Sequence, residues 1–366
     1  MPDRHDRPPL IGLYTGFRPP LDAVEPLRLR ALAAEALLQG ASFMVFATED
    51  ADPDSETIRG LVLEPDGWRE RRFRFPDVVM NPIYARRDID HAVEAVLRRH
   101  APFTTLRIAD KIGVAAMLEG TALAPHVIPY APLEADRIAG RIADFLAVHR
   151  RIVVKPAQGQ RGRGILFLTA TESGVRLRRH AEEVDTTVAA VAADLLPMLD
   201  EGRWLMQRLI LSRARGDRYF DVRVHVHKDS TGAWSPVRAY VRLSEAGLMV
   251  SNTSRGGYQG DIHQFFASLK QDAPALVDRL HRLGLEVAET VDGRYGGGID
   301  ELGIDLLVDG ARHPWVVEVN THPQSRYHEF MRAGHAIAYA RYLARTFRAA
   351  AGAVSATAGR PAADSP

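Results

Sequence analysis

The chain has 366 residues, of which 46% are hydrophobic and 25% are charged, a composition typical of a globular protein. Its 47 basic and 46 acidic residues leave a formal net charge of +1, which argues against a polybasic nucleic-acid binder and an acidic tail protein. The absence of cysteine excludes a disulfide scaffold, a cysteine nucleophile and a thiolate metal site. The charged, proline-containing start and the lack of a long apolar run predict neither a signal peptide nor a membrane span, so we expect a cytoplasmic protein.

The first hundred residues predict an α/β domain with a mixed or parallel sheet. Short strands are predicted at IGLYTG, SFMVFAT, IRGLVLE and DVVMN, and the alternating WRERRFRF is a further strand. Helices are predicted over 26–38, where alanine and leucine recur at helical spacing, and over 88–99. The next fifty residues are predicted to be mostly helical, with amphipathic stretches over 109–119 and 133–148.

The remainder of the chain predicts a compact α+β unit followed by a β-rich one. The first unit has the strand RIVVKP, the loop QGQRGRG, the strand ILFLTA, a polar helix over about 181–198 and the strand RWLMQRLI. The second has the strands YFDVRVHVHKD and WSPVRAYVRLS, a helix over about 274–291, the hairpin GIDLLVDGARHPWVVEVN and a last helix near 327–348. The end is rich in Ala, Gly, Pro and Ser, and we expect it to be disordered.

A lysine and a glycine-rich loop form the first candidate site, in VVKPAQGQRGRGI. Lysine occurs only four times in the chain, so Lys155 at the end of this strand is not a product of composition. A lysine supplies a point charge for phosphate, and glycines let the backbone approach an anion closely. The loop fits neither a Walker motif nor GxGxxG, and the alternative is a glycine-rich hairpin turn with a solvated lysine.

The hairpin at 304–320 forms the second candidate site. With a turn at Asp309-Gly310, Asp305 is predicted to lie opposite Glu318, and Asn320 shares one face of the strand with Glu318. The opposite face, with Val317 and Val319, is expected in the core. Carboxylate and amide oxygens suit Mg²⁺, whereas the alternative is a buried glutamate paired with an arginine.

Two further segments carry polar side chains at regular spacing. FDVRVHVHKD and VRAYVRLS alternate apolar and polar residues and predict a trough that binds anions through arginines, or a half-buried sheet with a solvated face. The polar positions are Asp221, Arg223, His225, His227, Arg238, Tyr240 and Arg242. A pair of metal-binding histidines is disfavoured, because no third ligand is evident. The loop SNTSRGG adds Asn252 and Arg255.

These motifs, in this order, resemble the ATP-grasp superfamily over 101–348. DVRV, SNTSRGG, LGIDLLVD and EVN are similar to the ribosomal-protein glutamate ligase branch, and DVVMNPIYARR with IADKIG resembles the spore-coat-associated branch. The resemblance implies an α/β (α+β) ATP-grasp fold in which two lobes clamp the nucleotide. The implied parts are an N-terminal pre-ATP-grasp domain (1–100), a helical central segment (101–150), a small α+β lid lobe (151–210), a C-terminal lobe with the metal site (211–348) and a disordered tail (349–366).

The resemblance also implies ATP and Mg²⁺ as cofactors, with a role for each matching residue. Those expected to bind ATP are Lys111, Lys155, Gln158, Gly159, Gly162, Gly164, Gln207, Arg208 and Leu209, the last three beside adenine and mostly through backbone. Asp305, Glu318 and Asn320 match the metal ligands. Arg223, Arg255 and Lys155 are the expected catalytic residues, and Asn252, Arg255, Gly256 and Arg238 are expected to contact the substrate. The ribose contact stays unassigned.

The implied activity is ATP-dependent formation of an amide bond through an acylphosphate, with release of ADP and phosphate. The expected partners are a small-molecule or peptide carboxylate and an amine. Neither nucleic acid nor membrane is expected as a partner, and a homodimer is left as a possibility. Two alternatives are kept. One is a non-catalytic nucleotide-binding or spore-coat-type structural protein with the same fold. The other is phosphoryl transfer without ligation, which hydroxylamine trapping without amine would distinguish.

Overall fold

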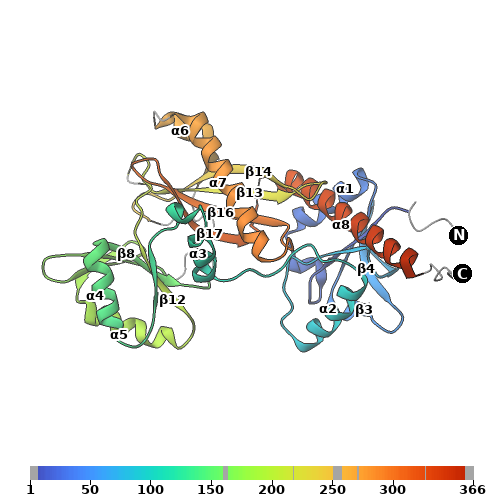
Figure 1. Ribbon diagram of the computed structural model, residues 1–366, viewed down its shortest axis with the longest axis horizontal. Coiled ribbons are helices and arrows are strands. Elements are labelled where there is room, and N and C mark those ends of the chain that lie inside the picture. Colours follow the sequence, from blue (N-terminus) through green and yellow to red (C-terminus); the bar gives the residue numbers. More distant parts are fainter. Residues whose placement is uncertain are drawn as a thin grey trace, which may run out of the picture.

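The computed structural model describes residues 7–159, 164–216, 218–249, 258–269, 272–325 and 327–358. The molecule is elongated, with three sheets arranged along its long axis (Figure 1). The mixture of sheets and helices confirms the predicted α/β (α+β) class. No helix in the described part of the chain has an apolar stretch long enough to span a bilayer.

The first sheet has six strands in the order β3-β4-β2-β1-β6, with β5 paired to β4. Strands β1, β2 and β6 are parallel, and such strands are usually covered by helices on both faces. Ile11 and Leu13 of β1 face α1 and α8, whereas Leu10 and Tyr14 face α2. The elements are β1 (Leu10–Tyr14), α1 (Pro26–Leu38), β2 (Ser42–Phe46), β3 (Ala51–Asp52), β4 (Thr57–Glu64), β5 (Gly67–Arg74), β6 (Val78–Met80) and α2 (Asp88–His100).

The C-terminal helix α8 (Glu329–Ala358) completes the core of this N-terminal domain. Its buried Ala336, Ile337 and Ala340 pack with Leu29 and Leu32 of α1. Segments from the two ends of the sequence therefore lie side by side, as Figure 1 shows for α1 and α8. The helix runs past its predicted end near Arg348, into the segment for which disorder was expected, and residues 359–366 lie outside the described part.

The second sheet, with its two helices, forms the lid lobe (residues 130–208). Its strand order is β11-β10-β9-β8-β12-β7, and α4 and α5 pack on one face. Ile152 and Val154 of β8 point into this core. Because successive side chains of a strand point to opposite faces, Lys155 points to the other face of the sheet. The elements are β7 (Tyr130–Leu133), α4 (Ile138–His149), β8 (Arg151–Pro156), β9 (Leu166–Ala170), β10 (Val175–Arg179), β11 (Glu182–Thr186), α5 (Val188–Leu199) and β12 (Trp204–Arg208).

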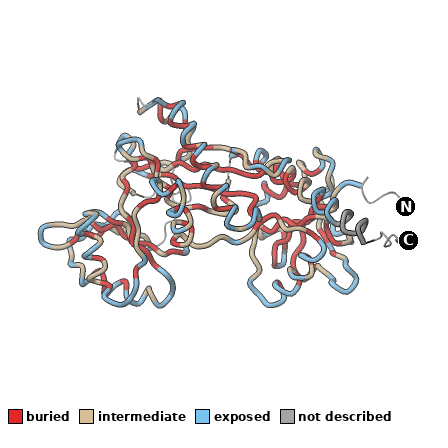
Figure 2. The backbone as a smooth tube through the Cα atoms, viewed as in Figure 1, coloured by how far each residue is buried: buried red, intermediate tan, exposed pale blue. Residues whose placement is uncertain are grey.

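The third sheet forms the centre of the C-terminal lobe, with the order β15-β14-β13-β16-β17. Val222, Val224 and Val226 of β13 pack in one core with α7, which leaves Arg223 and His225 on the opposite face. Figure 2 shows buried chain running through all three sheets. The elements are α3 (Lys111–Glu119), β13 (Phe220–Lys228), β14 (Trp234–Leu243), β15 (Tyr258–Asp261), α6 (Ile262–Ser268), α7 (Ala273–Arg294), β16 (Glu301–Val308) and β17 (Pro314–Thr321).

Two predicted helices begin later than the sequence pattern indicated. The helix predicted from 181 is wrong in its first part, because Glu182–Thr186 forms β11 antiparallel to β10 and the Thr187 side chain caps α5. The helix predicted from 133 is wrong at its start, because Leu133 ends β7, which pairs with β12. The central segment is divided between lobes, since α3 packs on α7 whereas β7 and α4 join the lid lobe.

Candidate functional site

Two carboxylates face each other across the β16–β17 hairpin. Asp305 and Glu318 are direct register partners, as the hairpin pattern predicted. A β-bulge leaves Val317 without a partner on β16, so Val316 and Val319 enter the core instead of the predicted Val317 and Val319. Val317 lines a pocket beside Glu318. Val317 and Glu318 thus share this pocket with Leu205 and Gln207 of the lid lobe.

Asp305 is held by two arginines, one from β13 and one from β14. Arg223, its register partner on β13, binds both carboxylate oxygens, one of them at 2.8 Å. Arg242 Nη2 lies 2.9 Å from Asp305 Oδ1 and also forms a fork with Asp221. Burial alone would raise the pKa of Asp305, but the two guanidiniums lower it below its usual value. Asp305 is thus an ionised, fixed carboxylate.

Gly303 makes room for Arg223 in this arrangement. It lies on β16 between His225 of β13 and Asn320 of β17. A Cβ atom there would come within 3.0 Å of the Arg223 side chain and 2.6 Å of Pro323 Cβ. A glycine inside a strand often marks such a close approach. Asn320 Nδ2 lies 3.4 Å from Asp305 Oδ2, so the three predicted metal-binding residues are grouped together.

Two lysines approach the same site, one from β8 of the lid lobe and one from the start of α3. Lys155 is buried, and its Nζ donates to Gln207 Oε1 of β12 at 2.7 Å. Burial lowers the pKa of Lys155 to about 8. The positive charge of Lys111 also lowers this pKa, whereas the negative charge of Glu318 raises it. Lys111, the first residue of α3, lies 3.3 Å from Glu318 Oε1 and donates to the carbonyl of Gly159 at 3.1 Å. The lysines and the carboxylates belong to one electrostatic site.

An apolar pocket lies between the lobes, next to these charges. Its lining includes Val114 and Leu118 of α3, Leu205 of β12 and the 316–319 stretch of β17. The polar groups in its wall are Lys111, Gln207 and Glu318. Such a combination of apolar walls with a few convergent polar groups is typical of a small-molecule site.

The other residues predicted for the nucleotide site do not line the pocket or lie outside the described residues. Arg208 and Leu209 do not line the pocket, and their backbone N–H groups bond to the carbonyls of Pro129 and Arg151. The guanidinium of Arg208 instead stacks 4.5 Å from the Trp315 ring. In the loop, Gly159 and Gly164 have positive φ, and Gln158 is exposed. Gly162 lies outside the described residues.

The predicted substrate residues are only partly described. Asn252, Arg255 and Gly256 lie outside the described residues. Arg238 is half-buried on β14, opposite His225 of β13, and forms no ion pair within the ranges that the structure describes. Of the predicted anion-binding trough, Arg223 and Arg242 are neutralised by aspartates, so Arg238 carries the uncompensated charge.

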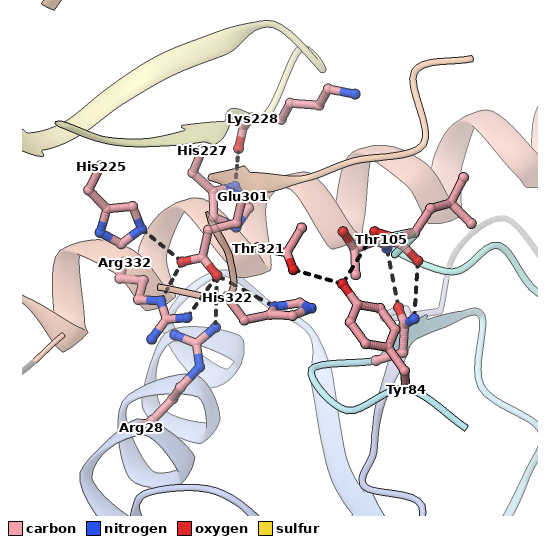
Figure 3. Close-up of polar contacts among 12 residues, drawn as sticks. Arg28, Tyr84, Thr105, His225, His227, Lys228, Glu301, Thr321, His322 and Arg332 are labelled. Carbon is pink, nitrogen blue, oxygen red and sulfur yellow. Dashed lines mark hydrogen bonds and ion pairs between the residues drawn. The ribbon is translucent and has the colours of Figure 1, made fainter. Parts of the chain in front are cut away.

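Sequence reasoning missed a buried polar cluster between the N-terminal domain and the C-terminal lobe. Glu301 of β16 lies at its centre and accepts hydrogen bonds from Arg332 of α8 and bonds to His225 of β13 (Figure 3). Arg28 of α1 lies 3.8 Å from the same carboxylate. The signal available was a pair of histidines within an apolar strand. His227 binds the Lys228 carbonyl, and the described residues contain no metal-binding group of histidines and carboxylates.

An apolar pocket flanked by a lysine of the lid lobe, a lysine of α3 and a carboxylate pair of the C-terminal lobe points to the class of ATP-grasp proteins. A sequence model of the YheC/D-like ATP-grasp family matches residues 100–348, and the chain belongs to this family. The chain is 24% identical to the endospore coat-associated protein YheD of Bacillus subtilis (strain 168) over 340 residues, which cover 86% of this chain and 72% of that protein.

Solved structures share the fold over nearly the whole chain. The crystal structure of D-cycloserine synthetase DcsG is similar with a TM-score of 0.55 and 16% identity, covering 92% of this chain and 99% of DcsG. A structure of the ATP-grasp ligase PsnB with a minimal precursor, Mg and ADP has a TM-score of 0.52 and 14% identity, covering 92% of this chain and 98% of PsnB. At these identities the likeness establishes the fold.

Proposed function

We propose that the chain is an ATP-dependent carboxylate–amine ligase that forms an amide bond and releases ADP and phosphate. The observation that carries this proposal is the convergence of Lys111 and Lys155 on the Asp305–Glu318 pair beside an apolar pocket. The names of the structural relatives, a synthetase and a ligase solved with a minimal precursor, support the same type of reaction.

In this proposal the nucleotide binds with its base toward the apolar wall and its phosphates toward the lysines. The apolar wall formed by Val114, Leu118 and Leu205 suits a purine ring. Lys111 and Lys155 lie at the polar end, where they would bind the phosphates. Gln207 holds the Lys155 ammonium in place, so its charge is positioned before the nucleotide binds.

Magnesium is the metal that the donor set suits. Asp305, Glu318 and Asn320 offer only carboxylate and amide oxygens, grouped across one strand pair. Hard oxygen donors without histidine or thiolate favour Mg²⁺, which is usually held jointly with nucleotide phosphates. These residues therefore fit the ion, which when bound would neutralise charge on the phosphates.

The reaction proceeds in two displacements. An oxygen of the substrate carboxylate attacks the γ-phosphorus, and the bond to the β–γ bridging oxygen breaks to release ADP. The amine nitrogen then attacks the acyl carbon, the carbon–oxygen bond breaks, phosphate leaves with the electron pair, and the nitrogen loses a proton. In this proposal the lysines hold the nucleotide and stabilise negative charge on the migrating phosphoryl group, whereas Arg223 keeps Asp305 in place.

The test is an ADP-release screen with ATP, Mg²⁺ and all pairs of the twenty proteinogenic amino acids, followed by mass spectrometry of the product. We expect that ADP is released only when both members of a pair are present, and that the product contains an amide bond. Lys155→Met and Glu318→Gln should each lower kcat/KM by about 100-fold or more, because the first removes a positive charge at the phosphates and the second removes a proposed metal ligand.

Glu64→Gln is the matched control, because Glu64 forms an exposed ion pair with Arg71 in the N-terminal domain, far from this chemistry. It should retain full activity. Full activity of Lys155→Met or Glu318→Gln, with the control behaving as expected, would show that the site is elsewhere.

A second candidate is a nucleotide-binding protein without ligase activity. Both carboxylate oxygens of Asp305 are engaged by arginines, an arrangement that weakens metal binding. Titration calorimetry with a non-hydrolysable ATP analogue separates the two. Binding that strengthens with Mg²⁺ supports the ligase, whereas binding that ignores Mg²⁺ supports the second candidate.

A further inference from the structure

A hydrogen-bonded chain of three buried side chains leads from the domain interface to the reaction site. Glu301 Oε1 of β16 lies 2.9 Å from His225 Nε2 of β13. His225 Nδ1 lies 2.8 Å from Nε2 of His328, in the segment just before α8. Each of the three side chains is at most 3% exposed. Water therefore does not compete for these bonds.

The protonation of the chain follows from its first member. Burial raises the pKa of Glu301, but Arg332 and Arg28 bring it well below its usual value, so the carboxylate is ionised and only accepts. His225 must then carry its proton on Nε2. Burial lowers the pKa of His225 to about 3, so this ring is neutral and its Nδ1 accepts a hydrogen bond.

His328 consequently carries its proton on Nε2 and presents a bare lone pair on Nδ1. Burial, with the charges of Arg238 and Arg332, lowers the pKa of His328 to about 4, so the ring is neutral at physiological pH. Nδ1 is buried and has no hydrogen-bond partner among the described residues. An acceptor left in this way is unfavourable and calls for a donor.

The His328 ring lies beside the two strands, β13 and β14, that carry the arginines of the reaction site. The His328 ring lies 5.6 Å from the Tyr240 ring, and Tyr240 is the register partner of Arg223. His225 is one ladder step from Arg223 on the same face of the sheet. Among the described residues, the charged and titratable groups around His328 include Arg223 and His225 of β13, Arg238 and Tyr240 of β14, Glu301 of β16, and Glu329 and Arg332 of α8.

We propose that His328 Nδ1 accepts an N–H hydrogen bond from the amine substrate, and that His225 and Glu301 act as positioning residues for it. The inference rests on the proposed ligase function and names the residue that recognises the amine. A neutral acceptor cannot bind a carboxylate, but it can hold an N–H and orient the nitrogen lone pair toward the acyl carbon. The charge of Arg238, which has no ion-pair partner among the described residues, disfavours an ammonium here, so the amine binds in its neutral, nucleophilic form.

Two substitutions separate the acceptor from the rest of the ring. His328→Gln can place an amide N–H near the Nε2 position to donate to His225, but it lacks an acceptor at Nδ1. His328→Asn places an amide oxygen near Nδ1 and loses the bond to His225. His227→Asn is the control, because His227 is buried on the same strand as His225 and its Nδ1 bonds only to the Lys228 carbonyl.

The assay uses the amino-acid pair that releases most ADP in the screen described above. His328→Gln should raise the KM for the amine at least tenfold and leave the KM values for ATP and the acid unchanged. His328→Asn should show a smaller rise, and His227→Asn none. Hydroxamate formation from ATP, the acid and saturating hydroxylamine should be unaffected by His328→Gln, because it does not require a bound amine.

The outcomes distinguish this inference from the proposed function. An unchanged amine KM in His328→Gln, or an equal rise in all three KM values, overturns the role of His328 while the ligase stands. Failure of the wild type to form hydroxamate or release ADP with any pair overturns the ligase instead. Histidine ¹⁵N NMR of the full chain gives an independent decision. A neutral His328 protonated on Nε2 at pH 7 is expected, and protonation on Nδ1 or on both nitrogens refutes the acceptor.

Discussion

Glu301→Gln is the most informative test of the interface between the N-terminal domain and the C-terminal lobe. The substitution keeps the side-chain shape and removes one buried negative charge. In the wild type the Glu301 carboxylate accepts hydrogen bonds from two nitrogens of Arg332, Nε and Nη2, the latter 2.8 Å from Glu301 Oε2. Arg28 Nη2 lies 3.8 Å from the same oxygen. The variant leaves two buried guanidiniums with a single remaining carboxylate, Glu329, at 3.2 and 3.3 Å.

The expected loss is large because an uncompensated charge stays buried. Removing one partner of a buried ion pair typically lowers stability by about 3–5 kcal/mol. Glu329 offsets part of the loss, so we expect about 3 kcal/mol for Glu301→Gln. The control Glu64→Gln removes an isosteric charge from an exposed pair with Arg71, for which less than about 1 kcal/mol is expected.

Urea denaturation at several pH values measures both the size and the origin of the effect. The pKa of Glu301 is lowered in the folded state, so its contribution is fully present above the unfolded-state pKa of about 4.3 and is lost as the pH falls below it. The difference in unfolding free energy between wild type and variant should therefore be full at pH 7 and shrink on acidification. A difference below about 1 kcal/mol at pH 7, or one independent of pH, would refute the reasoning.

Three further predictions test other parts of the molecule. Ile337→Ala should lower stability by about 2–5 kcal/mol in urea denaturation, because this fully buried side chain joins α8 to the N-terminal domain; a loss below about 1 kcal/mol would contradict that packing. ATP affinity measured by calorimetry should fall as the pH rises above about 8, where Lys155 loses its proton, and equal affinity at pH 7 and 9 would rule out its role at the phosphates. Gly303→Ala should reduce ADP release and stability, because the new Cβ would meet Arg223 and Pro323. The control Gly310→Ala, in an open turn, should retain activity. Activity of Gly303→Ala equal to that of the wild type would show that Arg223 can shift freely.

The elements with strong local patterns were predicted well. The helix over Pro26–Leu38 and the hairpin pairing of Asp305 with Glu318 follow from helical spacing and from the Asp-Gly turn, both of which are local signals. The strand β11 was mistaken for helix, because its pairing with β10 is a tertiary contact that a local polar pattern does not record. The bulge at Val317 was missed for the same reason, since it depends on the partner strand.

By itself, the sequence indicated the class of the protein through the resemblance of its motifs. It also indicated the chemical types of the candidate site residues, because a lysine at the end of a strand and carboxylates in a hairpin are readable from spacing. Only the tertiary structure decided how these residues are paired. In the tertiary structure Asp305 pairs with Arg223, and Lys155 donates a hydrogen bond to Gln207. His328 forms a hydrogen bond with His225, which is 103 positions away in the sequence. It also placed α8 in the core of the N-terminal domain. Contacts between residues so far apart depend on how the sheets and helices pack, and no periodicity along the chain encodes that packing.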